Sequence, residues 1–170
     1  MHEQKPALPE PWLRGTHNEV AAVPRAVLHA IELAKEDLWK WCFQLSDEQL
    51  NARPAGIAPV AFHLRHIARS LDRLLTYAEG SPLSEAQLAL LKTESDPDAT
   101  HAAIFHELET ALMRSAGRVR ALASEDLSAP RFVGKRQLPT TLGGLLVHVA
   151  DHTQRHVGQS ITSAKVVAAM

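Results

Sequence analysis

The sequence contains four long stretches in which apolar residues recur every three or four positions. This spacing places the apolar side chains on one face of an α-helix, so each stretch predicts a helix that buries one side. The predicted helices cover residues 19–44, 59–80, 97–122 and 140–170. Four amphipathic helices in a chain of 170 residues favour a single all-α domain, folded as a four-helix bundle over residues 1–170.

The segments between these stretches contain helix-breaking and helix-capping residues. Ser46 and Gln49 have the spacing of a capping box, which predicts a short helical turn after the first long helix. Residues 84–93 predict a short extra helix between the second and third long helices. Residues 124–139 contain two prolines and a glycine and predict a loop, and the proline-rich residues 1–18 predict an irregular N-terminal segment.

Charge and composition exclude several classes of protein. The formal net charge is -1, so no overall field attracts nucleic acid or an anionic membrane. Cys42 is the only cysteine, which rules out an internal disulfide and is typical of a cytoplasmic protein. The N-terminus lacks the apolar core of a signal peptide, and no apolar run approaches the about 20 residues that span a bilayer. We therefore expect a cytoplasmic protein that binds neither nucleic acid nor membrane.

Histidine is frequent, with 10 residues against 1 tyrosine, and one pair has the spacing of metal ligands. His152 and His156 lie four apart in the last predicted helix, where the periodicity requires apolar residues, and such residues share one helix face. Buried imidazoles need compensation, which either a metal ion or hydrogen bonds supply. His148 extends the series by one turn. Other histidines are expected to be solvated or locally bonded: His2, His17, His29, His101 and His106.

The second predicted helix carries another pair, His63 and His66. Helices that direct histidines toward one point are how a bundle builds an interior metal site. At about 100° per residue, the centre of the apolar stripe lies closer to His63 than to His66. Periodicity alone therefore favours His63 as the inward residue and leaves His66 as the alternative.

Two segments of the chain resemble the DinB-like superfamily. They are residues 62–68, which read FHLRHIA, and residues 152–159, which read HTQRHVGQ; residues 45–54 are also similar to the family's first interhelical segment. The resemblance covers residues 20–165 and implies a four-helix bundle, commonly a homodimer, with three histidines on one divalent metal. The family's pattern of His, one residue, then Ala matches 66–68, so it implies His66, His152 and His156 as ligands. We follow this pattern over the periodicity, because a ligand can reach in from the flank of a buried stripe.

The resemblance also implies a class of chemistry. Three protein ligands leave a coordination position open, which is typical of catalytic metal sites. Imidazole suits several metals, so we expect zinc or nickel, with iron or manganese as further options. Family members resemble thiol S-transferases or hydrolases, which implies a metal-dependent enzyme with a small-molecule substrate and, for transfer, a low-molecular-weight thiol. His63 and His148 are the candidates for contacting the ligands or the substrate. The alternative is a non-catalytic metal-binding or stress-related bundle.

Overall fold

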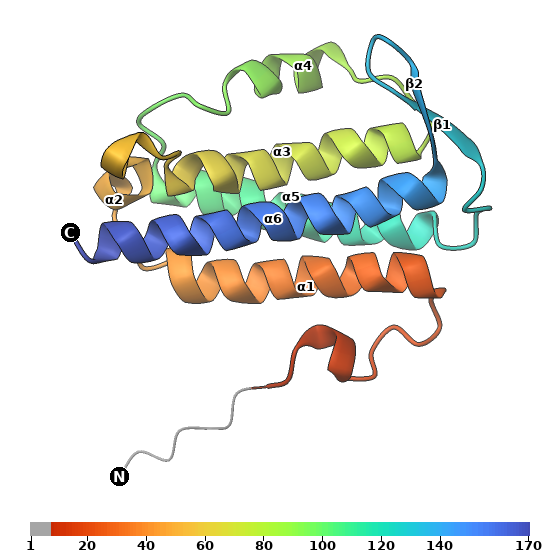
Figure 1. Cartoon of the computed structure of the whole chain (residues 1–170), viewed down its shortest axis with the longest axis horizontal. Coiled ribbons are helices and arrows are strands. Elements are labelled where there is room, and N and C mark those ends of the chain that lie inside the picture. Colours follow the sequence, from red (N-terminus) through yellow and green to blue (C-terminus); the bar gives the residue numbers. More distant parts are fainter. Residues whose placement is uncertain (1–7) are drawn as a thin grey trace.

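The computed structural model describes residues 8–170, which are organised around four long helices (Figure 1). The rest of the predicted irregular segment, residues 1–7 with His2, lies outside the described residues. The long helices are α1 (Ala22–Cys42), α3 (Val60–Ala78), α5 (His101–Ala121) and α6 (Leu142–Ala168). The connections contain the short helices α2 (Asp47–Asn51) and α4 (Glu85–Lys92), and 3-10 turns lie at Pro11–Leu13 and Pro54–Gly56. The predicted all-α bundle, with an extra helix between the second and third long helices, is confirmed.

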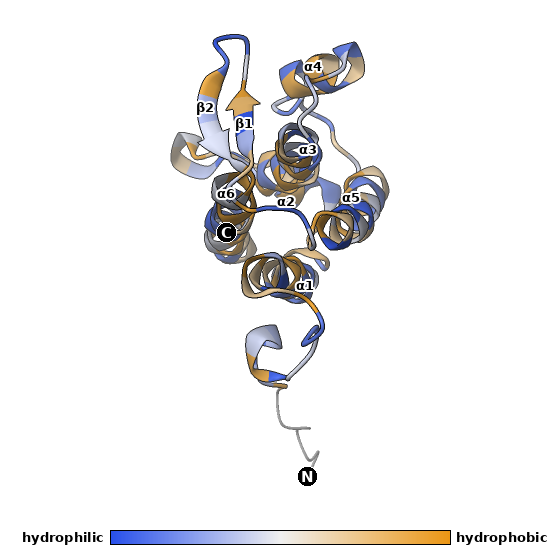
Figure 2. Ribbon diagram, turned by 90° about the vertical axis from the view of Figure 1, so that its right-hand side faces the viewer, coloured by the Kyte–Doolittle hydropathy of each residue, from blue (hydrophilic) through white to orange (hydrophobic). Residues whose placement is uncertain are grey.

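Each long helix packs against two of the other three. Both α1 and α3 contact α5 and α6, so that α1 and α3 lie at opposite corners of the bundle, as do α5 and α6 (Figure 2). A connection between opposite corners must cross an end of the bundle. Both such connections, residues 43–59 and 122–141, are long enough to carry secondary structure of their own. This arrangement places α3 beside α6, the two helices with the histidine pairs.

Polar caps define where several helices begin. At α2, the Ser46 side chain accepts a hydrogen bond from the Gln49 amide, and the Gln49 side chain accepts one from the Ser46 amide. The capping box predicted there is therefore confirmed. At α6, the Thr141 side chain accepts a hydrogen bond from the Gly144 amide. These bonds satisfy amide groups that the first turn of a helix leaves without a partner.

The third long helix begins later than its sequence predicts. Proline at position 97 suggested a start there, but α5 begins at His101, with Thr100 as its cap. Asp98 adopts a left-handed backbone conformation with a φ of 60°. A right-handed helix cannot continue through that conformation, so it can start only after Asp98.

The predicted loop 124–139 contains part of a small hairpin. Strands β1 (Pro130–Val133) and β2 (Leu138–Thr141) pair antiparallel, and Gly134 takes a positive φ of 72° directly after β1. Strands of four residues are too short for their alternation to be distinguished from a loop in sequence. The hairpin belongs to the connection between α5 and α6 and leaves the all-α character of the bundle unchanged.

None of the helices in residues 8–170 combines the length and apolar content that crossing a membrane would need.

The core is built from apolar side chains of the four long helices and α2. The largest fully buried side chains are Leu28, Leu38, Leu50, Leu64, Ile67, Leu71, Leu75, Leu108, Leu142, Leu146, Val27 and Val60. Their burial supplies the main driving force for folding.

Truncating one of these side chains is expected to cost several kcal/mol. Leu146 on α6 has an exposed fraction of 0%, so Leu146→Ala should lower the free energy of unfolding by about 2–5 kcal/mol, through lost burial and the cavity left behind. Urea unfolding of the metal-free parent and variant measures this difference in the free energy of unfolding. Met113→Ala on α5, where the side chain is 69% exposed, is the control and should change stability by less than about 0.5 kcal/mol. Equal effects of the two substitutions would contradict this account of the core.

Candidate metal centre

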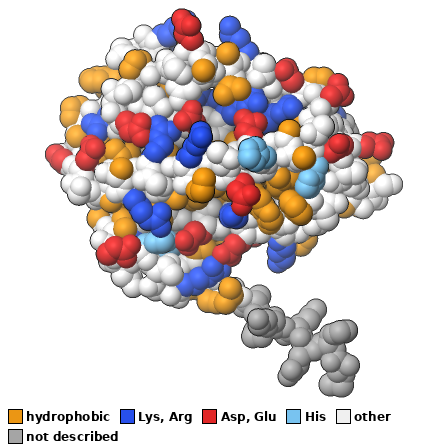
Figure 3. Space-filling view, turned by 180° about the vertical axis from the view of Figure 1, so that it is seen from behind, with side chains coloured by type: hydrophobic (Ala, Val, Ile, Leu, Met, Phe, Trp, Pro, Cys, Tyr) orange, Lys and Arg blue, Asp and Glu red, His pale blue; other side chains and the backbone are white. Residues whose placement is uncertain are grey.

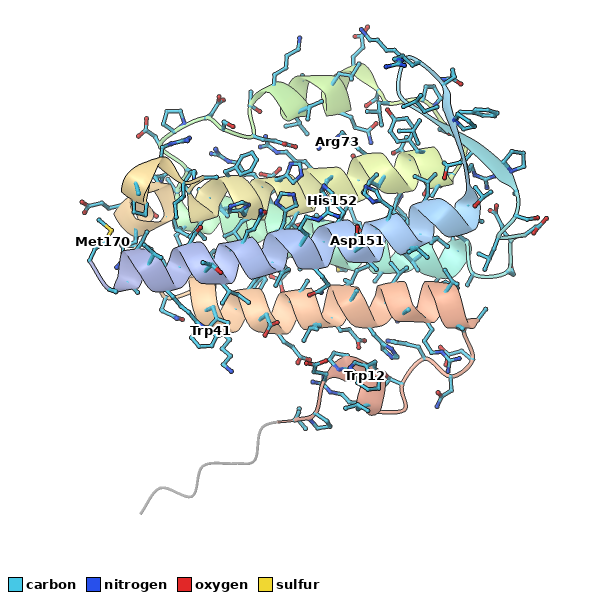
Figure 4. The ribbon with its side chains drawn as sticks, viewed as in Figure 1. Trp12, Trp41, Arg73, Asp151, His152 and Met170 are labelled. Carbon is cyan, nitrogen blue, oxygen red and sulfur yellow. The ribbon has the colours of Figure 1, made fainter. Side chains whose placement is uncertain are left out.

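Three histidine side chains converge between α3 and α6. His66 extends from α3, whereas His152 and His156 extend from successive turns of α6; Figure 4 shows His152 between these two helices. One ring nitrogen of each residue lies within 4.8 Å of those of the other two. The three pairs of ring centroids are 4.3, 4.7 and 5.0 Å apart. The structure therefore brings together the three residues that the resemblance singled out.

The cluster lies at the border of the core and not at its centre. On α6 the buried face runs through Val149, Thr153 and Val157, so His152 and His156 stand on the flank of that face. The periodicity of the sequence had placed His152 and His156 on the buried face, but the buried residues are their neighbours Thr153 and Val157. The polar Thr153 interrupts the apolar pattern, which hid this shift of one position. A flanking position keeps the rings partly exposed, and it leaves the cluster open to molecules arriving from solvent.

His63 and His148 occupy different positions relative to the cluster. His63 is 6% exposed and points into the protein, as the periodicity predicted, with its Nδ1 3.1 Å from Nδ1 of His156. His148 lies one turn before His152, has a side chain that is 46% exposed, and places Nδ1 3.7 Å from an oxygen of Asp151. His63 thus contacts a member of the three-histidine cluster directly, whereas His148 lies at its solvent-exposed edge.

Glu94 is a buried partner of the cluster that the sequence reasoning missed. Its carboxylate is 2.7 Å from His66 Nδ1 and accepts a hydrogen bond of 2.6 Å from Arg73 Nη1. A carboxylate only accepts, so His66 carries a proton on Nδ1 that faces Glu94, and Nε2 of the same ring lies 3.3 Å from Nε2 of His152. Glu94 lies in the irregular segment between α4 and α5, where no periodicity marks it.

The electrostatics favour the neutral form of three of the rings. Burial first, and then the charge of His66, lowers the pKa of His63, His152 and His156, each from 6.5 to about 4. Burial alone would raise the pKa of Glu94, but its hydrogen bonds from His66 and Arg73 outweigh that effect and lower it. Neutral imidazoles beside an ionised carboxylate are the protonation states that metal binding requires.

The donor set fits a divalent cation. Nδ1 of His152 is buried and has no hydrogen-bond partner among the described residues, so the cluster does not satisfy itself as a closed hydrogen-bonding network. Three imidazoles, one of them oriented by a carboxylate, match the ligands and the supporting contact of histidine metal sites.

A comparison with protein families agrees with the geometry. The family model of the DinB superfamily matches residues 30–160, more than half of the chain and all three histidines of the cluster. The chain belongs to the DinB superfamily. No curated protein matched the sequence. In this DinB protein the family assignment made from the residues 62–68 and 152–159 is thus confirmed.

A surface hollow lies beside the histidine cluster of the DinB protein. It is bordered by His63 from α3 and by Arg155, Gly158 and Gln159 from α6. A Cβ atom added at Gly158 would meet nothing within 4 Å, so this side of the hollow is open. The hollow gives a small molecule a place to bind next to His63, which contacts His156.

Another hollow lies between α3, α4 and α5, away from His63 and the three histidines. Two of its arginines have carboxylate partners: Arg69 Nε is 2.6 Å from Glu107, and Arg118 contacts Asp72 and Glu79. The face on which α5 lies accordingly shows acidic and basic side chains side by side (Figure 3). Among the described residues, the side chains whose possible ligand atoms converge lie outside this hollow, and the three histidines form one such group.

Neutralising Glu94 is expected to weaken metal binding without removing a ligand. In Glu94→Gln, an amide replaces the carboxylate that orients His66 and supports its basicity, and losses of about 10–100-fold in metal affinity follow such changes. Zinc titration against a competing chelator measures the effect. Glu107→Gln is the matched control, because it removes an equivalent charge that pairs with Arg69, a residue of the same helix as His66. Equal affinities for both variants and the parent would show that Glu94 has no such role.

Proposed function

We propose that this DinB protein holds one divalent metal ion through His66, His152 and His156 and uses it to transform a small-molecule substrate. The observation that carries the proposal is the convergence of these three rings within 4.8 Å, with His66 oriented by the buried Glu94 at 2.7 Å. Three protein ligands leave room for an exchangeable group, as in catalytic zinc sites. Zinc and nickel are the metals we favour, and iron and manganese also accept imidazole.

A divalent ion with an open position lowers the pKa of a coordinated thiol or water and polarises a substrate oxygen. The protein's own groups supply orientation and binding. Glu94 and Arg73 fix the ring of His66, and His63 contacts His156 from the side of the hollow. Arg155 and Gln159 offer a cation and an amide to a substrate in the hollow. We therefore propose thiol S-transfer or hydrolysis as the reaction class.

The partial exposure of the cluster favours catalysis over a purely stabilising ion. A structural metal site is normally closed by four protein ligands, whereas the cluster between α3 and α6 brings together three histidines beside an open hollow. Glu94 is buried behind His66 and hydrogen-bonds its ring, so it supports a ligand in this proposal.

The test combines metal analysis with an activity screen. Purified protein should contain at least one ion per chain, with one held by the three histidines, and should conjugate a common thiol to an electrophile or hydrolyse an ester or amide. The same sample stripped by a chelator is the control, and activity should return when the metal is restored. Protein that holds its metal but is inactive across both panels would favour the alternative, in which the ion only stabilises the bundle.

A further inference from the structure

The segment before α1 folds back along that helix. The 3-10 turn Pro11–Leu13 contacts α1, and Figure 1 shows this segment beside α1, outside the four-helix bundle. Arg14 forms two hydrogen bonds with the Glu36 carboxylate, at 2.5 and 2.7 Å. The segment is thereby held against the outer face of α1.

This contact assembles a second group of metal-binding side chains. His29 and Glu32 are three residues apart on α1 and share a face. His17 reaches them from the N-terminal segment, and one ligand atom of each residue lies within 4.8 Å of those of the other two. None of the three belongs to the histidine cluster between α3 and α6.

The local geometry of these residues is unusual for a surface contact. His17 has a left-handed backbone with a φ of 57°, which L-residues disfavour. Its Nε2 lies 2.6 Å from Oε1 of Glu32. The His29 Nε2 faces Thr16, with the hydroxyl at 3.2 Å and the carbonyl oxygen at 3.3 Å. The N-terminal segment thus places a ligand atom of His17 close to those of His29 and Glu32 on α1.

We propose that His17, His29 and Glu32 form a second divalent-metal site, which fastens the N-terminal segment to α1. Two imidazoles and a carboxylate are a donor set that zinc and other first-row divalent metals accept. On binding, the ion would take the place of the proton between His17 Nε2 and Glu32, and the neutral ring would carry that proton on Nδ1 instead. The carboxylate then balances part of the ion's charge.

Arg120 provides a specific check on this assignment. Its Nη2 lies 3.4 Å from Nδ1 of His17. A guanidinium only donates, so Nδ1 accepts and the proton of the ring sits on Nε2, facing Glu32. An ion on Nε2 would shift the ring proton to Nδ1, and Arg120 would then have to turn away. Arg120→Gln removes a positive charge and offers an oxygen that accepts from Nδ1, so it should tighten metal binding.

The test is a zinc titration of chelator-stripped protein in the full-length variant His152→Ala/His156→Ala, which lacks two bundle ligands. One zinc ion per chain should still bind, and binding should weaken by about 100-fold or more when His29→Ala or Glu32→Gln is added, because a ligand is lost. Glu19→Gln removes an equal charge from the same segment outside the cluster and should leave the affinity unchanged. Equal affinity with and without His29, or no zinc bound by the folded variant, would overturn the proposal.

A second measurement does not depend on that variant. In the parent protein two ions should bind, and Glu32→Gln should reduce this to one while the bundle site stays filled. Zinc should also slow hydrogen exchange of the amides in residues 11–20 in the parent and not in Glu32→Gln. Unchanged stoichiometry together with unchanged exchange in the parent and the variant would show that no ion binds here.

Discussion

Replacing His152 by alanine is expected to remove the metal ion of the bundle site and the turnover that depends on it. The substitution leaves two of the three converging imidazoles, and we expect zinc affinity to fall by about 100-fold or more, which corresponds to about 3 kcal/mol. The ring belongs to the cluster, with Nε2 3.3 Å from Nε2 of His66. Metal analysis after dialysis, zinc titration and the thiol-conjugation and hydrolysis assays measure the two losses.

The matched control for this substitution is His148→Ala. His148 lies on the same helix one turn earlier, and its side chain is half-exposed and outside the three-residue cluster. Its replacement should preserve metal content, and any change in rate would then report a contact with the substrate or with His152. Loss of metal from His148→Ala as complete as from His152→Ala would overturn the proposed set of ligands.

Acidifying the metal-free protein is expected to lower its stability between pH 6.5 and 5. The pKa values of His63, His152 and His156 are lowered from 6.5 to about 4 by burial. In this pH range the unfolded chain binds protons that the native state rejects, so the free energy of unfolding falls as the pH decreases. After allowance for solvent screening, the lowered pKa of His63 alone should reduce the free energy of unfolding by about 1–2 kcal/mol as the pH falls from 6.5 to about 4.

Urea unfolding in the presence of a chelator, at intervals from pH 7 to pH 5, measures this effect. Above pH 5 most ordinary carboxylates are still ionised in both states, so the histidines dominate the change. His63→Gln should make the dependence on pH shallower, because one of the shifted groups is gone. A free energy of unfolding that stays constant from pH 7 to pH 5 would mean that the rings are not buried as described.

The periodicity of the sequence predicts the four long helices because each buries one face, but it does not say which helices are neighbours. The placement of α3 beside α6 follows from connections that cross the ends of the bundle. The ambiguity between His63 and His66 has a physical basis as well. The two residues are three apart on one side of α3. In the structure His63 is buried in the core, whereas His66 lies at the flank of the buried face.

Residues outside the helices were the hardest to foresee. Glu94 reaches His66 only because the irregular segment after α4 returns to α3. His17 meets His29 and Glu32 only because the N-terminal segment lies along α1, although each of these histidines was expected to be solvated or locally bonded. Contacts of this kind depend on tertiary packing, for which local spacing contains no signal.

The position of the bundle site in the chain has a consequence for how long the native state lasts. His66 and His152 are separated by 86 residues, so an ion that binds both closes a long loop, much as a covalent cross-link would. Contacts between such distant residues tend to form late in folding. An interaction absent from the transition state slows unfolding and leaves the folding rate unchanged. Metal binding would thus act chiefly by lowering the unfolding rate, which extends the lifetime of the folded chain.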